Sequence, residues 1–211
     1  MSSDKQQPSR RERAAQRRAE IVAMAAELFA RNGFRGTALA DVAREAGITQ
    51  PGLLHHFGTK EGLLIAVIEQ RNADSEAYAM ELLGLSPDVR LRELPNYARR
   101  NRERAGLAKL FTVLVAENLE PDAPAHEHFV DRYRAMRAIV TESLRRAQED
   151  GEARTDFDPW VKATEIVATL DGLQTQWLLD PDEVDIVDSV ESYAATLQRE
   201  ILIDHEVEEV G

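Results

Sequence analysis

The stretch from Thr37 to Lys60, TALADVAREAGITQPGLLHHFGTK, is the feature that most constrains the fold of this chain. Its pattern is that of two short helices joined by a tight turn. Ala43 is small enough for the helices to approach closely, and Gly47 can take the left-handed conformation that ends the first helix. Thr49 stands where an N-cap belongs. The spacing predicts a helix-turn-helix whose second helix can enter a DNA major groove, with an ordinary helical hairpin as the alternative.

The flanks of this stretch favour the DNA-binding interpretation. An apolar face at helical spacing precedes it, and a C-terminal signal at Asn32–Gly33 ends that helix. After the stretch, Thr59 is placed to cap a further helix that has Lys60 in its first turn. A lysine at that position opposes the helix dipole, whereas beside a phosphate it is favourable. We therefore expect Lys60 to contact the DNA backbone.

These residues resemble the amino-terminal DNA-binding domain of the TetR family of transcriptional regulators, over about residues 21–69. The matching residues are Ile21, Ala25, Leu28, Phe29, Gly33, Thr37, Val42, Ala43, Ala46-Gly47-Ile48-Thr49, Gly52-Leu53, His56-Phe57 and Lys60-Glu61. The resemblance implies a three-helix DNA-binding domain followed by a helical domain for ligand binding and dimerisation. One departure is Leu54, where the family usually has a tyrosine that touches a phosphate, so that backbone contact is in doubt.

The expected DNA contacts gather on the second helix of the motif. Gln50 can pair with adenine in the major groove, and Pro51 can meet a thymine methyl group. The full set of residues that we expect at the DNA is Thr37, Thr49, Gln50, Pro51, His55, His56 and Lys60. On this reading the chain is a regulator, most simply a repressor that a small effector releases from a pseudo-palindromic operator. Control by a protein partner instead of a small ligand is the alternative.

Composition bounds the remaining classes of protein. The chain has 211 residues, of which 43% are hydrophobic and 30% charged, so it can bury a core as one large or two small domains. It lacks cysteine, which excludes disulfides and thiolate sites, and it has no apolar run of about 18 residues to span a membrane. The amino terminus lacks the apolar segment of a signal peptide. We expect a cytoplasmic protein.

Sequence motifs give no support to an enzyme. The nucleophile elbow, the P-loop and the dinucleotide fingerprint are all missing from the sequence, so we expect neither catalysis nor a cofactor. His126 and His128, near Asp122 and Glu127, could bind a metal if their segment folded inward. The alternative, which we prefer, is an exposed proline-rich loop that binds no metal.

The net charge of −12 is unevenly distributed along the chain. Residues 1–60 hold 10 Lys and Arg against 6 Asp and Glu, whereas residues 61–211 hold 16 against 32. An acidic body would be repelled by phosphate and would orient the basic end toward DNA. The acidic residues also solvate a helical surface, and the two interpretations are compatible.

Breaks and periodicity predict an all-α chain in three parts: a disordered tail over residues 1–9, the DNA-binding domain over 10–59 and a helical regulatory and dimerisation domain over 60–211. Helices are expected at 60–83, 89–104, 106–119, 126–149, 158–179 and 183–203, with breaks at Gly106, Pro121, Pro124, Gly151 and Pro181. No segment alternates with the period of a strand. The first helix starts with Arg10, Arg11, Arg13, Arg17 and Arg18, which form either an arm for phosphate or the minor groove, or a solubilising helix end.

Two apolar stripes near the carboxyl end suggest a homodimer. A narrow seam on the last helix and a stripe on the helix before it could build a four-helix interface across a two-fold axis. The residues assigned to this interface are Ile166, Leu170, Val187, Val190, Ala194, Leu197 and Ile201. Packing of both stripes inside one subunit is the alternative.

A binding site for an effector is less clearly marked. Polar groups interrupt apolar helices at a few positions, where they would point into a cavity or simply find partners in the core. The candidate ligand-binding residues are Phe111, Asn118, Tyr133, Met136, Asp171, Gln174 and Trp177. Nothing in the pattern identifies the effector.

Overall fold

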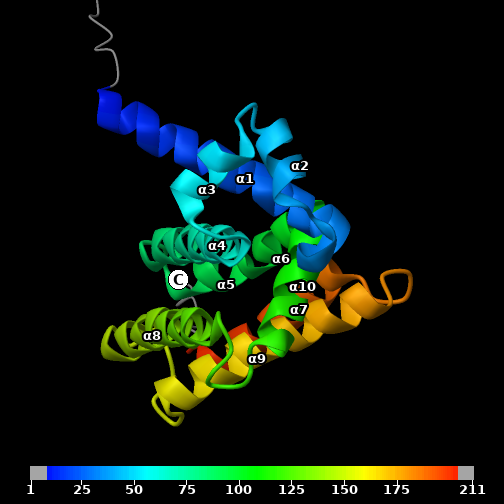
Figure 1. Cartoon of the computed structure of the whole chain (residues 1–211). Helices are drawn as coiled ribbons and strands as arrows, with labels where there is room; N and C mark the ends of the chain where they lie inside the picture. The colour runs from blue at the N-terminus through cyan, green and yellow to red at the C-terminus, as the bar shows by residue number, and fades with distance from the viewer. Residues whose placement is uncertain (1–8, 204–211) are drawn as a thin grey trace, which may run out of the picture. The chain divides into compact units, whose positions relative to one another are not determined.

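The computed structural model describes residues 9–203, which form ten helices and no β-strand (Figure 1). A lone antiparallel bridge joins Ala153 to Leu202. The all-α prediction is confirmed. Most of the tail predicted over residues 1–9 lies outside the described residues, and Ser9 caps the first helix. Within residues 9–203, no helix is long and apolar enough to cross a membrane.

The chain divides into two compact units, residues 1–71 and 72–211. The boundary falls inside a helix, later than the break at residues 59 and 60 that the sequence suggested. The reason is that the first turns of this helix bury Leu63, Leu64 and Val67. An apolar face of this kind belongs to the core that it helps to close.

The first unit is built from three helices and the start of a fourth. They are α1 (Arg10–Gly36), α2 (Leu39–Glu45), α3 (Gln50–Phe57) and α4 (Lys60–Leu83). The face predicted on α1 is buried, with Ile21 and Ala25 fully covered. Gly33 interrupts α1 with φ 73°, as expected from the Asn32–Gly33 signal, because few residues other than glycine adopt a positive φ.

The second unit contains the end of α4 and six further helices. They are α5 (Pro87–Arg92), α6 (Leu94–Glu103), α7 (Ala105–Glu117), α8 (His126–Glu149), α9 (Pro159–Leu179) and α10 (Ile186–Ile201). The single helix expected over 89–104 is two helices, because Pro95 starts α6 and cannot continue a preceding hydrogen-bond ladder. Gly106 is not a break, since the chain turns at Arg104 and Gly106 lies inside α7.

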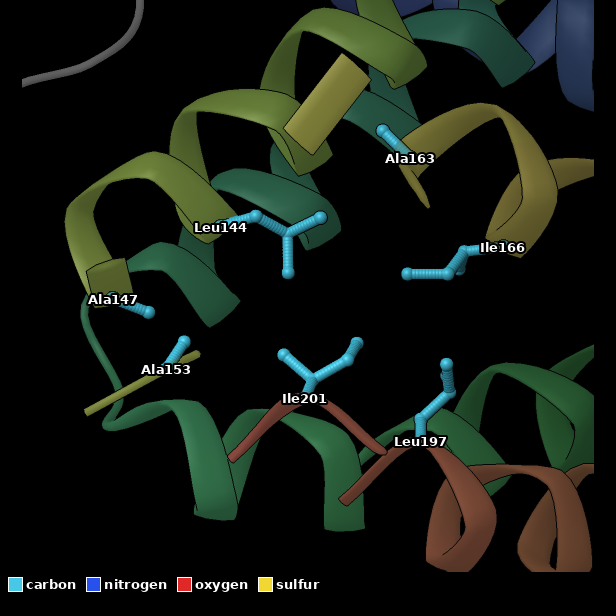
Figure 2. Packing of buried hydrophobic residues seen from close by; sticks show 7 residues of the cluster. All are labelled: Leu144, Ala147, Ala153, Ala163, Ile166, Leu197 and Ile201. Atoms are coloured by element: carbon cyan, nitrogen blue, oxygen red, sulfur yellow. The ribbon is translucent and has the colours of Figure 1, made fainter. Parts of the chain in front are cut away.

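The core of the second unit joins its last three helices. Figure 2 shows side chains from α8, α9 and α10 meeting in one cluster, together with Ala153 from the turn after α8. The cluster contains Leu144, Ala147, Ala153, Ala163, Ile166, Leu197 and Ile201. A second cluster packs Trp177 and residues of α10, including Val187 and Val190, against α6 and α7.

These clusters overturn the predicted dimer seam. Leu197 and Ile201 are each 1% exposed within a single subunit. Ile166, Val187, Val190 and Ala194 are likewise buried in the subunit, and Leu170 packs against both clusters. The stripe was correctly recognised as apolar, but its partners are the helices of its own chain. The alternative stated from the sequence, packing inside the monomer, is the observed arrangement.

Candidate functional site

The turn between α2 and α3 has the geometry that the sequence predicted. Gly47 has φ 63°, and the amide of Ile48 donates to the carbonyl of Ala43 at 2.9 Å. This is the hydrogen-bond pattern of a glycine-terminated helix. The Thr49 hydroxyl accepts a hydrogen bond from the Gly52 amide at 3.2 Å, so Thr49 is the N-cap of α3. Leu53, 1% exposed, anchors α3 in the core of the first unit.

The other side of α3 is free of the protein core. Gln50, Pro51, His55 and His56 are all exposed. Pro51 and His55 are four residues apart and therefore share one face of the helix. A short helix that is anchored by one buried leucine and presents polar groups on its opposite side can enter the major groove of DNA. Contact of these four residues with bases remains a prediction.

Thr37 does not fit the role expected for it. Its side chain is 1% exposed, and its hydroxyl donates to the carbonyl oxygens of Gly33 at 2.9 Å and Leu28 at 3.2 Å. The hydroxyl is thus committed to the end of α1, where it satisfies carbonyls that lack a helical partner. The expectation that the Thr37 side chain touches DNA is corrected to a role in joining α1 to α2.

The start of α4 is capped as predicted, and its lysine already has protein contacts. The Thr59 hydroxyl accepts from the Gly62 amide at 2.9 Å. The Lys60 Nζ lies 4.7 Å from the centre of the Phe34 ring and 3.4 Å from the carbonyl oxygen of Arg35. These contacts hold the ammonium group against α1, so a phosphate contact by Lys60 would add to or replace them. That contact remains a prediction.

The second unit contains a partly open cavity of about 160 Å³. Apolar side chains dominate its wall, which comes from the end of α4 and from α5, α6, α8 and α9. The lining residues are Ser75, Tyr78, Ala79, Leu82, Leu83, Arg90, Leu91, Leu94, Tyr97, Arg132, Tyr133, Met136, Ile139, Val140, Ser143, Leu144, Ile166, Val167, Leu170 and Asp171. An apolar cavity of about 150 Å³ can hold a benzene-sized molecule, so this one has room for a small organic ligand.

A hydrogen-bonded pair gives the cavity its main polar feature. The Tyr133 hydroxyl donates to Asp171 Oδ2 at 2.7 Å. Burial raises the pKa of Asp171 above its ordinary value, although the bond from Tyr133 and the charge of Arg132 oppose that shift. Burial and the neighbouring carboxylate also raise the pKa of Tyr133. A carboxylate has about four acceptor positions, so Asp171 can accept a further donor from a ligand.

Arg90 lies at another part of the cavity wall and is held by the end of α4. Its guanidinium donates to the carbonyl oxygens of Leu82 at 2.9 Å and Leu85 at 2.6 Å, and to the hydroxyl of Ser143. Burial lowers the pKa of Arg90. The terminal carbonyls of a helix attract a cation, so Arg90 serves as a cap for α4 as well as a wall of the cavity.

The candidate ligand-binding residues divide in two. Tyr133, Met136 and Asp171 line the cavity, whereas Phe111, Asn118, Gln174 and Trp177 do not. The latter four are buried elsewhere in the second unit, and a ligand contact by them stays a prediction. Phe111 is buried in the second unit, and Trp177 belongs to a core cluster.

The two buried amides among these four have their partners within the protein. Gln174 accepts from Asn101 at 2.7 Å and donates to Thr112 at 3.1 Å. Asn118 donates to the Leu114 carbonyl at 2.8 Å and accepts from the Ala125 amide at 3.0 Å. Buried amides are stable when their hydrogen bonds are made, which is the case here. Both amides therefore make one donor and one acceptor bond inside the protein.

Sequence reasoning missed the arginines and two of the tyrosines of the cavity. A signal for part of them exists on α4, where Ser75, Tyr78, Ala79 and Leu82 follow a helical spacing on one face. His126 and His128 start α8, and the His126 Nδ1 lies 3.1 Å from the carbonyl oxygen of Asn118. Within residues 9–203, no group of three or more metal-binding side chains is close enough to hold an ion.

The two units match two models of bacterial regulators. Residues 21–67 match the model for bacterial regulatory proteins of the tetR family, and residues 94–201, about half of the chain, match that for the carboxy-terminal domain of BetI-type transcriptional repressors. The chain belongs to the tetR family of transcriptional regulators. It is therefore a DNA-binding regulator of transcription and not an enzyme.

Individual relatives of this tetR-family protein agree with the assignment. The HTH-type transcriptional regulator TtgR of Pseudomonas putida is 29% identical over 199 residues, which cover 88% of this chain and 91% of TtgR. A solved structure concerned with control of antibiotic production by bacterial hormones is 26% identical, with a TM-score of 0.74 over 89% of this chain and 98% of the other. FadR from Bacillus subtilis, solved with stearoyl-CoA, shares the fold at 18% identity, with a TM-score of 0.72 over 85% of this chain and 96% of FadR.

Proposed function

We propose that this tetR-family protein is a homodimeric repressor, which leaves a pseudo-palindromic operator when a small molecule occupies the cavity of the second unit. The observation that carries the proposal is that α4 contributes residues to both units. This helix starts directly after α3, with Lys60, and its last turns supply Ser75, Tyr78 and Leu82 to the cavity wall. One continuous helix thus belongs to both the DNA-binding unit and the ligand-binding unit.

The cavity also supports a small ligand over a protein partner as the controlling signal. A concave, mostly apolar space with a few polar groups is the usual form of a small-molecule site. Its wall favours an effector with an apolar body and a hydrogen-bond donor that reaches Asp171. A ligand shifts a regulator only if it binds the two conformations unequally, and coupling of about 1–3 kcal/mol would change operator affinity by roughly 5- to 150-fold.

For the dimer, the exposed side of α9 replaces the seam that turned out to be buried. We call this side the outer face of α9; it consists of Val161, Thr164, Ala168, Thr175 and Leu179. Val161 and Leu179, at the two ends of this face, are 52% and 81% exposed, and the residues between them are small. A second copy of α9 could cover this face across a two-fold axis, as a dimer that reads two half-sites requires.

The test begins with duplexes selected by the protein from a randomised pool. Compounds with an apolar body and one donor group are then screened for release of the selected duplex. The variant Val167→Phe fills the cavity, and Ala138→Phe on the exposed side of α8 is its control. We expect Val167→Phe to bind the duplex but to lose the response to a compound that releases the control. Equal responses of the two variants would refute the cavity as the effector site.

A further inference from the structure

The first turns of α1 extend from the body of the first unit as an exposed helix. Residues 10–16 are all exposed, and in Figure 1 the blue start of α1 reaches beyond α3. The segment precedes the match to the family model, which begins at residue 21. It carries Arg10, Arg11 and Arg13, and Arg17 and Arg18 follow one turn later. No ion pair joins Arg10, Arg11 or Arg13 to another residue of the described part.

This exposed helix has a well-defined start. The amide of Ser9 donates to Glu12 Oε2 at 2.6 Å, and the Ser9 hydroxyl accepts from the Glu12 amide at 3.2 Å. The two bonds form a complete capping box, which satisfies the amides at the beginning of the helix. The arginines that follow are therefore presented on a helix and at fixed angles around it.

Three arginines at this position are unfavourable for the helix itself. Positive charges in the first turn oppose the helix dipole, at a cost of about 0.3–1 kcal/mol each. Arg10 and Arg13 are also like charges three residues apart, which adds repulsion. The capping box stabilises the start of this helix, whereas the arginines in its first turn destabilise it. Such conflicts are expected where a partner of opposite charge is bound.

The arginines also share one side of α1. At about 100° per residue, all five fall within an arc of about 160°. The opposite side carries Glu12, Ala15, Gln16 and Ala19. Two members of the arc show where it faces. Arg17 donates to the carbonyl of Ala46 at the end of α2, and the guanidinium of Arg18 lies 5.1 Å from the centre of the Phe57 ring at the end of α3. The arc therefore faces the helix-turn-helix, and Arg10, Arg11 and Arg13 continue it beyond α3.

We propose that Arg10, Arg11 and Arg13 bind phosphates of the DNA that flanks the half-site read by α3. Contacts of this kind position a protein on the duplex without reading its sequence. They would also make up for Leu54, which cannot donate to a phosphate, and for Lys60, whose ammonium already contacts Phe34 and Arg35. Insertion into a membrane surface is disfavoured, because the side opposite the arginines offers only alanines as apolar groups.

The test compares the variant R10Q/R11Q/R13Q with the wild type on two duplexes. One is the selected site alone, and the other has a further helical turn of arbitrary sequence on each side. Glutamine keeps the helix propensity and removes the charge. The control R134Q/R145Q/R146Q removes three exposed arginines from α8, so its net charge changes equally. Dissociation constants are measured by fluorescence anisotropy between 50 and 200 mM salt, and circular dichroism checks that both variants are folded.

We expect the wild type and the control to bind the longer duplex more tightly, and the arm variant to lose that advantage. The slope of log K against log salt should fall by about 0.9 for each lost contact, or roughly 2.7 per subunit, which is a 40-fold difference between 50 and 200 mM. Base preference should not change. Equal slopes for the arm variant and the control would overturn the proposal. So would an unchanged slope combined with lost co-sedimentation with phosphatidylglycerol vesicles, since that result would assign the arginines to a membrane.

Discussion

Replacement of Leu197 by alanine tests whether the apolar stripe of α10 belongs to the core or to an interface. Leu197 is 1% exposed and packs in the cluster with Leu144, Ile166 and Ile201 (Figure 2). The substitution removes three carbon atoms, worth about 2.4 kcal/mol of transfer free energy at ~0.8 kcal/mol each. The cavity left behind adds to this, so the free energy of unfolding should fall by roughly 3–5 kcal/mol. For a chain of this size we expect the melting temperature to drop by about 6–20 °C.

The matched variant is Ala168→Glu, at the middle of the outer face of α9. Ala168 is exposed in the subunit, and glutamate is a good helix former, so the fold should lose no more than about 0.5 kcal/mol. In a dimer that closes over this face, however, the same carboxylate would be buried without a partner, at a cost of several kcal/mol. Leu197→Ala should therefore give unstable dimers, and Ala168→Glu should give stable monomers.

Urea titration and sedimentation velocity, carried out over a range of protein concentrations, separate these outcomes. The loss in Leu197→Ala should be present at every concentration, because it arises inside each subunit. Association by contrast depends on mass action, so the defect of Ala168→Glu should weaken as concentration rises. A Leu197→Ala variant that unfolds like the wild type but sediments as a monomer would refute the core assignment and restore the seam.

Three further substitutions test the DNA face and the cavity. Gln50→Ala should cost about 1–3 kcal/mol at one base position and relax specificity there, which selection from a random pool measures; an unchanged preference excludes base reading by Gln50. Lys60→Ala should lower the salt slope by about one for all sequences, and a change of base preference at constant slope would contradict this. Asp171→Asn should stabilise the protein above the raised pKa of Asp171. The folded state holds the Asp171 proton more tightly than the unfolded state, so stability is lost as pH rises through the folded pKa. The advantage of the variant should disappear below the unfolded pKa of about 3.9, and an advantage that persists there in urea titrations would show another cause.

Local chemistry explains why the helix-turn-helix could be predicted in detail. The roles of Gly47, Thr49 and Thr59 depend on bonds to residues a few positions away, and all three make the expected turn or cap. The prediction that the Thr37 side chain contacts DNA was wrong, because its environment is not set by local bonds alone. Its hydroxyl donates to Gly33, four residues earlier, and also to Leu28, nine residues earlier, and the local sequence does not indicate that the side chain is buried against the end of α1.

The cavity residues could be predicted only in part from polar positions in apolar helices. The sequence marks Asp171 as a polar interruption of an apolar helix and Tyr133 as a candidate for an apolar wall, and the two side chains are hydrogen-bonded to each other. Gln174 was chosen on the same ground, one turn after Asp171 on α9, yet it bonds to Asn101 and Thr112 in the core. A helical position turns by about 100° per residue, so neighbouring polar groups on α9 face different partners. Only the placement of α6, α7 and α8 around α9 decides which of them meets empty space.

Burial of the apolar stripe of α10 inside the subunit restricts where a dimer interface can form. An apolar stripe at heptad spacing predicts that this side of the helix is buried. Either a partner subunit or a neighbouring helix of the same chain can bury it. Here the stripe of α10 is covered by α6, α8 and α9 of its own chain. The surface that we propose for association is the outer face of α9, where the small exposed residues Thr164, Ala168 and Thr175 would allow a second helix to approach closely. We therefore expect substitutions on that face to change the dimer without unfolding the subunit, and substitutions in the stripe to destabilise the subunit itself.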